Sequence, residues 1–131
     1  MVRRQTQFLG YRNVFYRVLE SRLKFGKDPE SGKKTTQVNC TIKAQDIVEI
    51  SPWIMDGGLQ EVFLITHYLD KQENQLGYFK YCFYNASVTE YREEFDKKLM
   101  ESLLKFSFVA ESVTALDEKK EMELNNLLNS L

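Results

Sequence analysis

The chain has 131 residues, of which 43% are hydrophobic and 28% are charged, a balance typical of one folded domain. Its 18 Lys and Arg residues nearly balance 19 Asp and Glu residues, so the net charge of −1 points to neither nucleic acid nor a membrane surface. The sequence has no long apolar run and no apolar leader. We therefore expect no membrane partner and a cytoplasmic location, from which any export would act on the folded protein.

The charges are unevenly distributed along the chain. Residues 1–34 hold nine basic and three acidic residues, whereas residues 111–131 hold five acidic and two basic residues. This polarity suits head-to-tail stacking of subunits, or a basic patch that binds polyanions. Cys40 and Cys82 both fall in apolar strand-like patterns, so we expect two reduced thiols in the core.

The first third of the chain predicts an arm and a hairpin. Residues 1–12 are polar and basic, and we expect a loosely held arm that could pair as an edge. Residues 13–25 alternate as a strand does, although a helix over residues 14–23 is the alternative. Residues 26–34 combine glycine, proline and lysine in a solvated loop that joins two strands as a long hairpin. The second strand, residues 35–43, alternates with three inward positions: Val38, Cys40 and Ile42.

The period changes over residues 44–56, where apolar residues take helical spacing: Ile47, Ile50, Trp53 and Ile54. Pro52 interrupts this pattern, so we expect a short helix that ends or bends near Ser51. Gly57 and Gly58 would close it. Trp53 is interpreted as a core residue of this helix, and a ligand platform is the alternative.

A strand over residues 59–68 and a turn over residues 69–76 precede the longest strand-like stretch, residues 77–95. Its aromatic face contains Phe79, Tyr81 and Phe83, then the apolar signal changes face, and Tyr91 and Phe95 return to the first face. This change of phase predicts a bulge or bend near Asn85, so that one strand serves two packed sheets. Two shorter strands with a turn at Asn85 are the alternative.

The end of the chain predicts one more strand and a helix. Residues 100–113 alternate as the last strand, and residues 114–117 form a weak capping box. Helical spacing then predicts an amphipathic helix that packs on its own barrel or on a neighbour, through Leu124, Leu127, Leu128 and Leu131. We therefore predict a mainly β fold, a small β-barrel or two packed antiparallel sheets with one short inserted helix. The barrel domain spans residues 1–113, and residues 114–131 form a C-terminal helical extension.

Residues that could support catalysis are sparse. His67, the single histidine, lies in a strand pattern without an evident nucleophile beside it. Two cysteines and one histidine make no zinc spacing, and no glycine-rich phosphate loop is present. Glu90, Glu93 and Glu94 stand among basic residues, as on a solvated rim. We therefore expect no enzyme activity, no cofactor and no metal.

The order of these elements resembles the tail-tube fold of contractile phage tails and type VI secretion tubes, and more closely the Hcp/TssD tube proteins of Bacteroidota. Residues 16–20 (YRVLE) resemble an early Y-x-V-L-(D/E) strand, and residues 28–36 resemble a D-x-x-G-(R/K)-P-S-S loop, with Lys34 in place of proline. Residues 53–56 (WIMD) resemble the W-M-(L/V)-D helix end, and residues 86–95 an A-x-x-V-x-Y-x-E-x-F strand. Pro52 and the tail after Leu116 depart from the family.

This resemblance implies a structural protein without catalytic residues. Six copies would form a ring, and rings would stack head to tail into a tube whose other partners are a spike, a sheath and secreted effectors. By family position, the loop would contact the adjacent ring through Lys27, Asp28, Glu30, Lys33 and Lys34. The long strand would supply core and assembly residues: Phe79, Tyr81, Phe83, Tyr91 and Phe95.

An OB-fold that binds single-stranded nucleic acid is the alternative function. Its basic groove and stacking aromatics would come from the basic first third and from surface Tyr or Phe residues. The net charge of −1 argues against it. The helix also argues against it, because an OB-fold places its helix after the third strand and the expected order places it after the second.

Overall fold

The computed structural model describes residues 4–45 and 47–130. This part of the chain is mainly β, as predicted, with all its strand pairs antiparallel. Its elements are β1 (Arg4–Tyr11), β2 (Val14–Lys27), β3 (Lys34–Lys43), α1 (Ser51–Asp56), β4 (Gln60–Leu69), β5 (Gln75–Asp96), β6 (Glu101–Ala110), β7 (Ser112–Asp117) and α2 (Glu118–Asn129).

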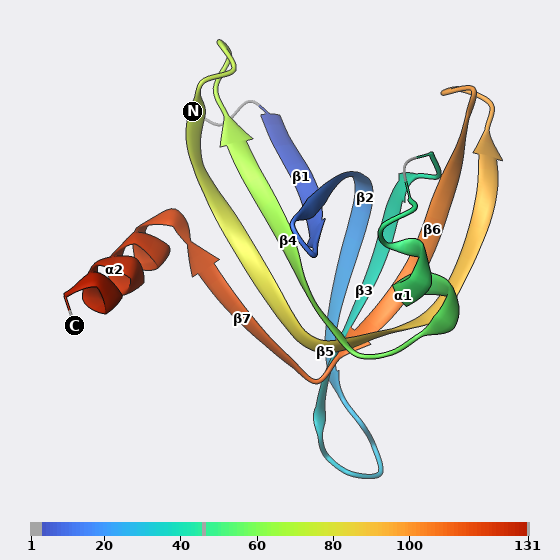
Figure 1. Cartoon of the computed structure of the whole chain (residues 1–131), viewed down its shortest axis with the longest axis horizontal. Coiled ribbons are helices and arrows are strands. Elements are labelled where there is room, and N and C mark those ends of the chain that lie inside the picture. The colour runs from blue at the N-terminus through green and yellow to red at the C-terminus, as the bar shows by residue number, and fades with distance from the viewer. Residues whose placement is uncertain (1–3, 46, 131) are drawn as a thin grey trace.

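The strands form one sheet in the order β4-β1-β2-β3-β6-β5-β7, and an additional pairing of β4 with β5 closes it into a barrel. Figure 1 shows β1 and β4 diverging from β3 and β6 above a shared base, with α1 on the side of β6. The hairpin of β2 and β3 projects below this base, and α2 extends to the side beyond β7. The predicted small barrel with one inserted helix and one C-terminal helix is confirmed.

The long strand β5 is continuous and bent, as predicted. Asn85 has a φ of 51°, and the register with β4 shifts at the same place, between Gln60 and Val62. Strands β6 and β7 continue one another along β5, because Val109 pairs with Ser87 and Ser112 pairs with Tyr84. The alternative of two shorter strands separated by a turn at Asn85 is therefore wrong.

The core lies inside the barrel beneath α1. Trp53 is 2% exposed and stacks on Tyr11 at a centroid distance of 5.7 Å. Its indole Nε1 donates a hydrogen bond of 3.0 Å to the carbonyl oxygen of Ala86, next to the bend in β5. Phe106 and Phe108 complete the aromatic cluster. Trp53 is therefore a core residue, and its polar atom is satisfied as burial requires.

Two expectations about the N-terminal half are wrong. The arm is a full strand rather than an edge, because β1 pairs with β2 on one side and with β4 on the other; residues 1–3 lie outside the described part. The helix predicted over residues 44–56 spans only Ser51–Asp56, with Pro52 in its first turn. The backbone N–H groups of a first helical turn have no partner within the helix, so a proline, which lacks this N–H, is tolerated there. Pro52 therefore lies at the start of this helix rather than at its end. Gly57 closes the helix with a φ of 83°, as expected.

The C-terminal boundary is also corrected. Residues 114–117 belong to β7, because pairing with β5 continues to Asp117. Asp117 is the N-cap of α2 and accepts a hydrogen bond of 2.7 Å from the backbone N–H of Lys120. The extension beyond the sheet therefore starts at Glu118, and Leu131 lies outside the described residues.

Candidate functional site

The predicted stacking loop is exposed and internally bonded at the tip of the β2–β3 hairpin. Asp28 donates its N–H to the Lys33 carbonyl and accepts from the Gly32 N–H, both at 2.8 Å. Its carboxylate accepts from the Glu30 N–H at 2.9 Å, and Gly32 supplies the positive φ of 69°. Lys27 and Lys34 pair across the base. These bonds fix the loop, so its Lys and Glu side chains project from a preorganised turn.

The five predicted residues of the long strand separate into three environments. Phe83 is fully buried, whereas Phe79 and Tyr81 are half-buried and contact each other at a centroid distance of 4.9 Å. Tyr91 and Phe95 are 49% and 58% exposed, because they lie past the bend and beyond the core. Only the last two can therefore contact another molecule through most of their rings.

Several strand edges are unpaired within the described residues, among them that of β7, which pairs only with β5, and two of the others belong to one sheet. Beyond Val18, β2 pairs only with β3, so residues 20–27 have a free side. Beyond Ala86, β5 pairs only with β6, so residues 87–96 have a free side. These two segments are the outer strands of one four-stranded sheet, β2-β3-β6-β5. An unpaired edge is a template for another strand.

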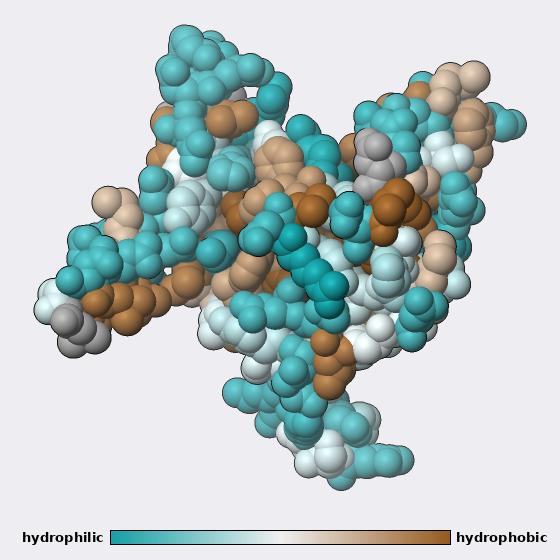
Figure 2. Space-filling view, viewed as in Figure 1, coloured by the Kyte–Doolittle hydropathy of each residue, from teal (hydrophilic) through white to brown (hydrophobic). Residues whose placement is uncertain are grey.

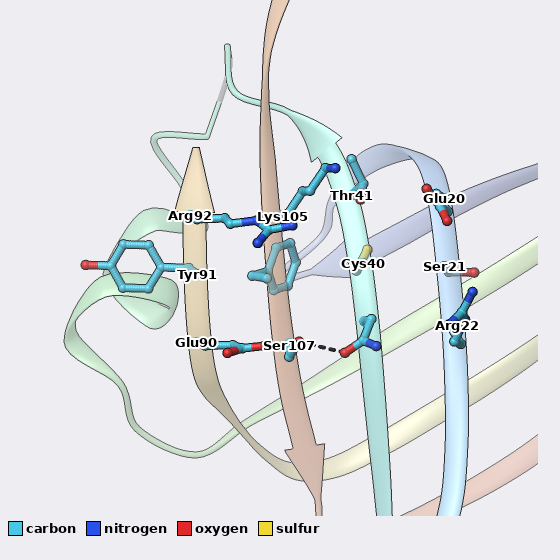
Figure 3. Close-up of a pocket in the computed structure, with 12 residues that line it drawn as sticks. Glu20, Ser21, Arg22, Cys40, Thr41, Glu90, Tyr91, Arg92, Lys105 and Ser107 are labelled. Carbon is cyan, nitrogen blue, oxygen red and sulfur yellow. Dashed lines mark hydrogen bonds between the residues drawn. The ribbon is translucent and has the colours of Figure 1, made fainter. Parts of the chain in front are cut away.

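The outward face of this four-stranded sheet is polar (Figure 3). One row crosses the sheet through Glu90, Ser107, Asn39 and Arg22, and the next row contains Arg92, Lys105, Thr41 and Glu20. The Ser107 hydroxyl donates to the Asn39 side chain at 2.6 Å. A groove of about 350 Å³ runs across these rows.

The ion pairs on this polar face centre on Glu94. Glu94 contacts Lys105 at 2.8 Å and Arg92 at 3.3 Å. The hydrogen bond from Lys105, and then the charge of Arg92, hold the pKa of Glu94 below its usual value. Of the three glutamates predicted as a solvated rim, Glu94 forms ion pairs and Glu90 accepts a hydrogen bond from the Ser107 hydroxyl at 3.4 Å.

The remaining candidate residues lack a catalytic arrangement. His67 lies between the rings of Phe8 and Tyr78, at centroid distances of 5.9 and 6.0 Å. Cys40 and Cys82 are free and buried, as expected. Over residues 4–45 and 47–130, no group of His, Cys, Asp and Glu side chains could hold a metal ion.

None of the helices in the described chain has the length and apolar character that a membrane span requires.

Sequence reasoning missed an aromatic patch on the outward face of β1, β2 and β4, formed by Phe8, Phe15 and Phe63. A Cβ on Gly10 would lie 3.1 Å from the Phe15 ring and 3.2 Å from the Phe63 ring, so both rings cover this glycine. Arg17 lies over Phe8 at 5.9 Å and Lys80 over Phe63 at 5.1 Å. The pairing of β1 with both neighbours creates this patch. It was not predicted because residues 1–12 were expected to form a loosely held arm.

No family model and no curated protein matches this chain. Solved structures do. Hcp1 from Flavobacterium johnsoniae aligns with a TM-score of 0.61 and 16% identity over 84% of this chain and 94% of its own. Hcp1 from Salmonella typhimurium aligns with a TM-score of 0.63 and 13% identity over 88% and 85%. Another Hcp protein aligns with a TM-score of 0.60 and 13% identity over 86% and 98%.

The chain therefore has the Hcp-like tube fold that its motifs predicted. The helix argument against an OB-fold is wrong, since α1 follows the third strand once β1 is counted. The fold assignment rests instead on the alignment with the three Hcp structures.

Proposed function

We propose that this protein is a structural tube subunit of a contractile injection apparatus of the type VI secretion kind. Six copies form a ring, and rings stack head to tail into a tube that carries effectors. The unpaired edges of β2 and β5 carry this proposal, because they lie on opposite sides of one sheet. Pairing of the β5 edge of one copy with the β2 edge of the next is a heterologous contact, which closes when the rotation permits.

The polar face of the same sheet supports a pore lining. If the edges join around a ring, the rows of Glu90 and Arg92 face one common space. Balanced charges keep such a lining wet without holding a passing chain by strong attraction. The protein is then a conduit, without a catalytic step.

The ends of the molecule support stacking. The β2–β3 loop projects from one end, and the β4–β5 and β5–β6 turns lie at the other (Figure 1). Contact of the loop with the facing end of the next ring would propagate a tube. A spike and a sheath would then bind its end and its outer wall. Such a protein would be made in the cytoplasm and exported through its own apparatus.

Mass measurement by size-exclusion chromatography with light scattering, followed by negative-stain imaging, tests the proposal. A particle of about six subunits with a central hole is the expected result. A single-subunit mass at every concentration would overturn it. A shift of labelled single-stranded DNA by such a monomer would favour nucleic-acid binding instead.

A further inference from the structure

Helix α2 is oriented with polar residues toward the barrel. In its described part, the half-buried residues are Glu118 and Glu121, and the Glu121 carboxylate lies 3.1 Å from Lys80 Nζ on β5. Leucines at helical spacing are exposed instead: Leu124 by 46%, Leu127 by 61% and Leu128 by 57%. We call these three residues the leucine stripe. Figure 2 shows hydrophobic residues along the lower side of this helix.

Only the start of α2 contacts the barrel, so its leucines, which lie in later turns, are exposed, whereas an amphipathic helix usually buries its apolar side. Glu118 also contributes to the contact between the start of α2 and the barrel, because its carboxylate lies 3.3 Å from the position that a Cβ on Gly77 would take. The leucine stripe is not packed on its own sheet. An exposed apolar row of this kind marks a contact with another molecule.

The aromatic patch offers a matching surface. Phe15 is 57% exposed, and no other layer of the described chain covers its ring. Three leucines at positions i, i+3 and i+4 are the anchors by which a helix docks on an apolar surface. Both surfaces lie on the same chain, so every copy carries one of each, as a heterologous contact between copies requires.

The charges at the margins of the two surfaces are complementary. Arg17 and Lys80 lie at the margin of the aromatic patch. Glu121 and Glu123 flank the leucine stripe, and Lys80 already holds the former within the same chain. Glu123 is therefore available to approach Arg17 of a second copy. Opposite charges at an interface margin steer association and fix its register.

We propose that the leucine stripe of α2 docks on the aromatic patch of a second copy of this chain. The proposal rests on the proposed function, since it adds one contact between neighbouring subunits. The aromatic patch of each copy is thus covered by helix α2 of a neighbouring copy in the same assembly. Unlike the strand edges, the contact is made by side chains alone, so it can be removed without disturbing the sheet.

Disulfide trapping tests the contact directly. A chain with Leu127→Cys is mixed with a tagged chain that carries Phe15→Cys, and both are oxidised with copper phenanthroline. We expect a covalent dimer between the two chain types. Met122→Cys, whose side chain is 58% exposed but outside the leucine stripe, is the matched control and should give little product. The native thiols are buried and contribute no background.

Absence of the mixed dimer would overturn the docking. So would a chain with both cysteines that closes an internal disulfide and stays monomeric, since the helix would then cover its own sheet. These outcomes are separate from those for the proposed function. If rings form but the disulfide does not, the docking is wrong and the proposed function stands. If the disulfide forms but rings do not, the docking stands and the proposed function is wrong.

A second measurement gives the strength of the contact. Leu124→Gln with Leu127→Gln and Leu128→Gln should raise the concentration needed for assembly at least about tenfold, because buried anchors dominate such contacts. Met122→Gln should leave it unchanged. Far-UV circular dichroism must show an unaltered melting transition of the barrel in both variants. Assembly of the triple variant at wild-type concentrations would contradict the docking.

Discussion

At the scale of single residues, Trp53 joins the inserted helix to the bend of the long strand. Replacement by alanine removes three aromatic contacts and the bond to Ala86, and should reduce the free energy of unfolding by about 3–5 kcal/mol. Trp53→Phe keeps most of the packing but removes the hydrogen bond to the Ala86 carbonyl, a cost of about 0.5–1.5 kcal/mol. Urea unfolding followed by circular dichroism measures both.

Met55, on the same helix but 53% exposed, provides the control for that experiment. Met55→Ala should change the free energy of unfolding by no more than about 0.5 kcal/mol. If the Met55 and Trp53 variants lost equal free energy of unfolding, the indole would not be the group that stabilises the helix against the long strand.

The two thiols are predicted to be inert in the folded protein. Burial raises the pKa of Cys40 to about 12 and also raises that of Cys82, so both stay protonated at pH 8. Labelling with a thiol reagent at pH 8 should therefore require denaturant. Rapid labelling of either thiol in the native protein would show that the barrel opens locally.

The same shift gives stability a pH dependence. The pKa of Cys40 is higher in the folded chain than its ordinary value of 9.0, so unfolding releases a proton at alkaline pH. The contribution of the thiol is complete below pH 9.0 and is lost as the pH rises toward about 12. Cys40→Ala should remove this part of the alkaline destabilisation, as measured by urea unfolding at pH 8 and pH 10.

At the scale of elements, Asn85 makes the bend of β5 possible. Its φ of 51° is tolerated by asparagine and glycine, and its side chain donates a 2.9 Å hydrogen bond to Glu111. Asn85→Gly and Asn85→Val both lose that bond. The valine variant should be less stable by about a further 1–2 kcal/mol, because a β-branched residue is strained at positive φ. Equal stabilities in thermal unfolding would show that the bend does not depend on this residue.

Alternation predicted the central strands well, because each has one buried face. The inward positions of β3 are those the pattern indicated, Val38, Cys40 and Ile42, and all three are buried. Strand β1 was missed because its Arg4–Gln7 segment is polar. One of its two partners, β4, is also distant in the sequence, although the other, β2, follows it directly. Ile47 and Ile50 have helical spacing, yet the helix begins only at Ser51, since a proline fits the first turn best.

The candidate site was predictable only in part. The composition of residues 26–34 identified the projecting loop, because glycine, proline and lysine mark solvated turns. The exposure of Tyr91 and Phe95 was not predictable, since parity alone does not reveal where a strand leaves the core. The aromatic patch was missed because Phe63 is brought beside β1 only by the pairing of β1 with β4.

At the scale of the whole molecule, the loop should control stacking but not ring formation. Lys33→Glu with Lys34→Glu reverses two exposed charges at the projecting end, so tubes should shorten or disappear while single rings remain. Electron microscopy measures the length of the tubes, and light scattering measures the mass of the single rings. Lys33→Arg with Lys34→Arg keeps the charge and is the matched control. Tubes of unchanged length in the glutamate variant would exclude this role.

Strands β5, β6 and β7 extend outward from a single turn at residues 97–100, so each new residue pair forms next to one already made. Joining β3 to β6 instead brings together residues as distant as Thr36 and Ala110. A short loop costs less entropy to close than a long one, and local contacts form fastest. We therefore expect refolding to nucleate at this turn and to finish with the pairing of β3 with β6.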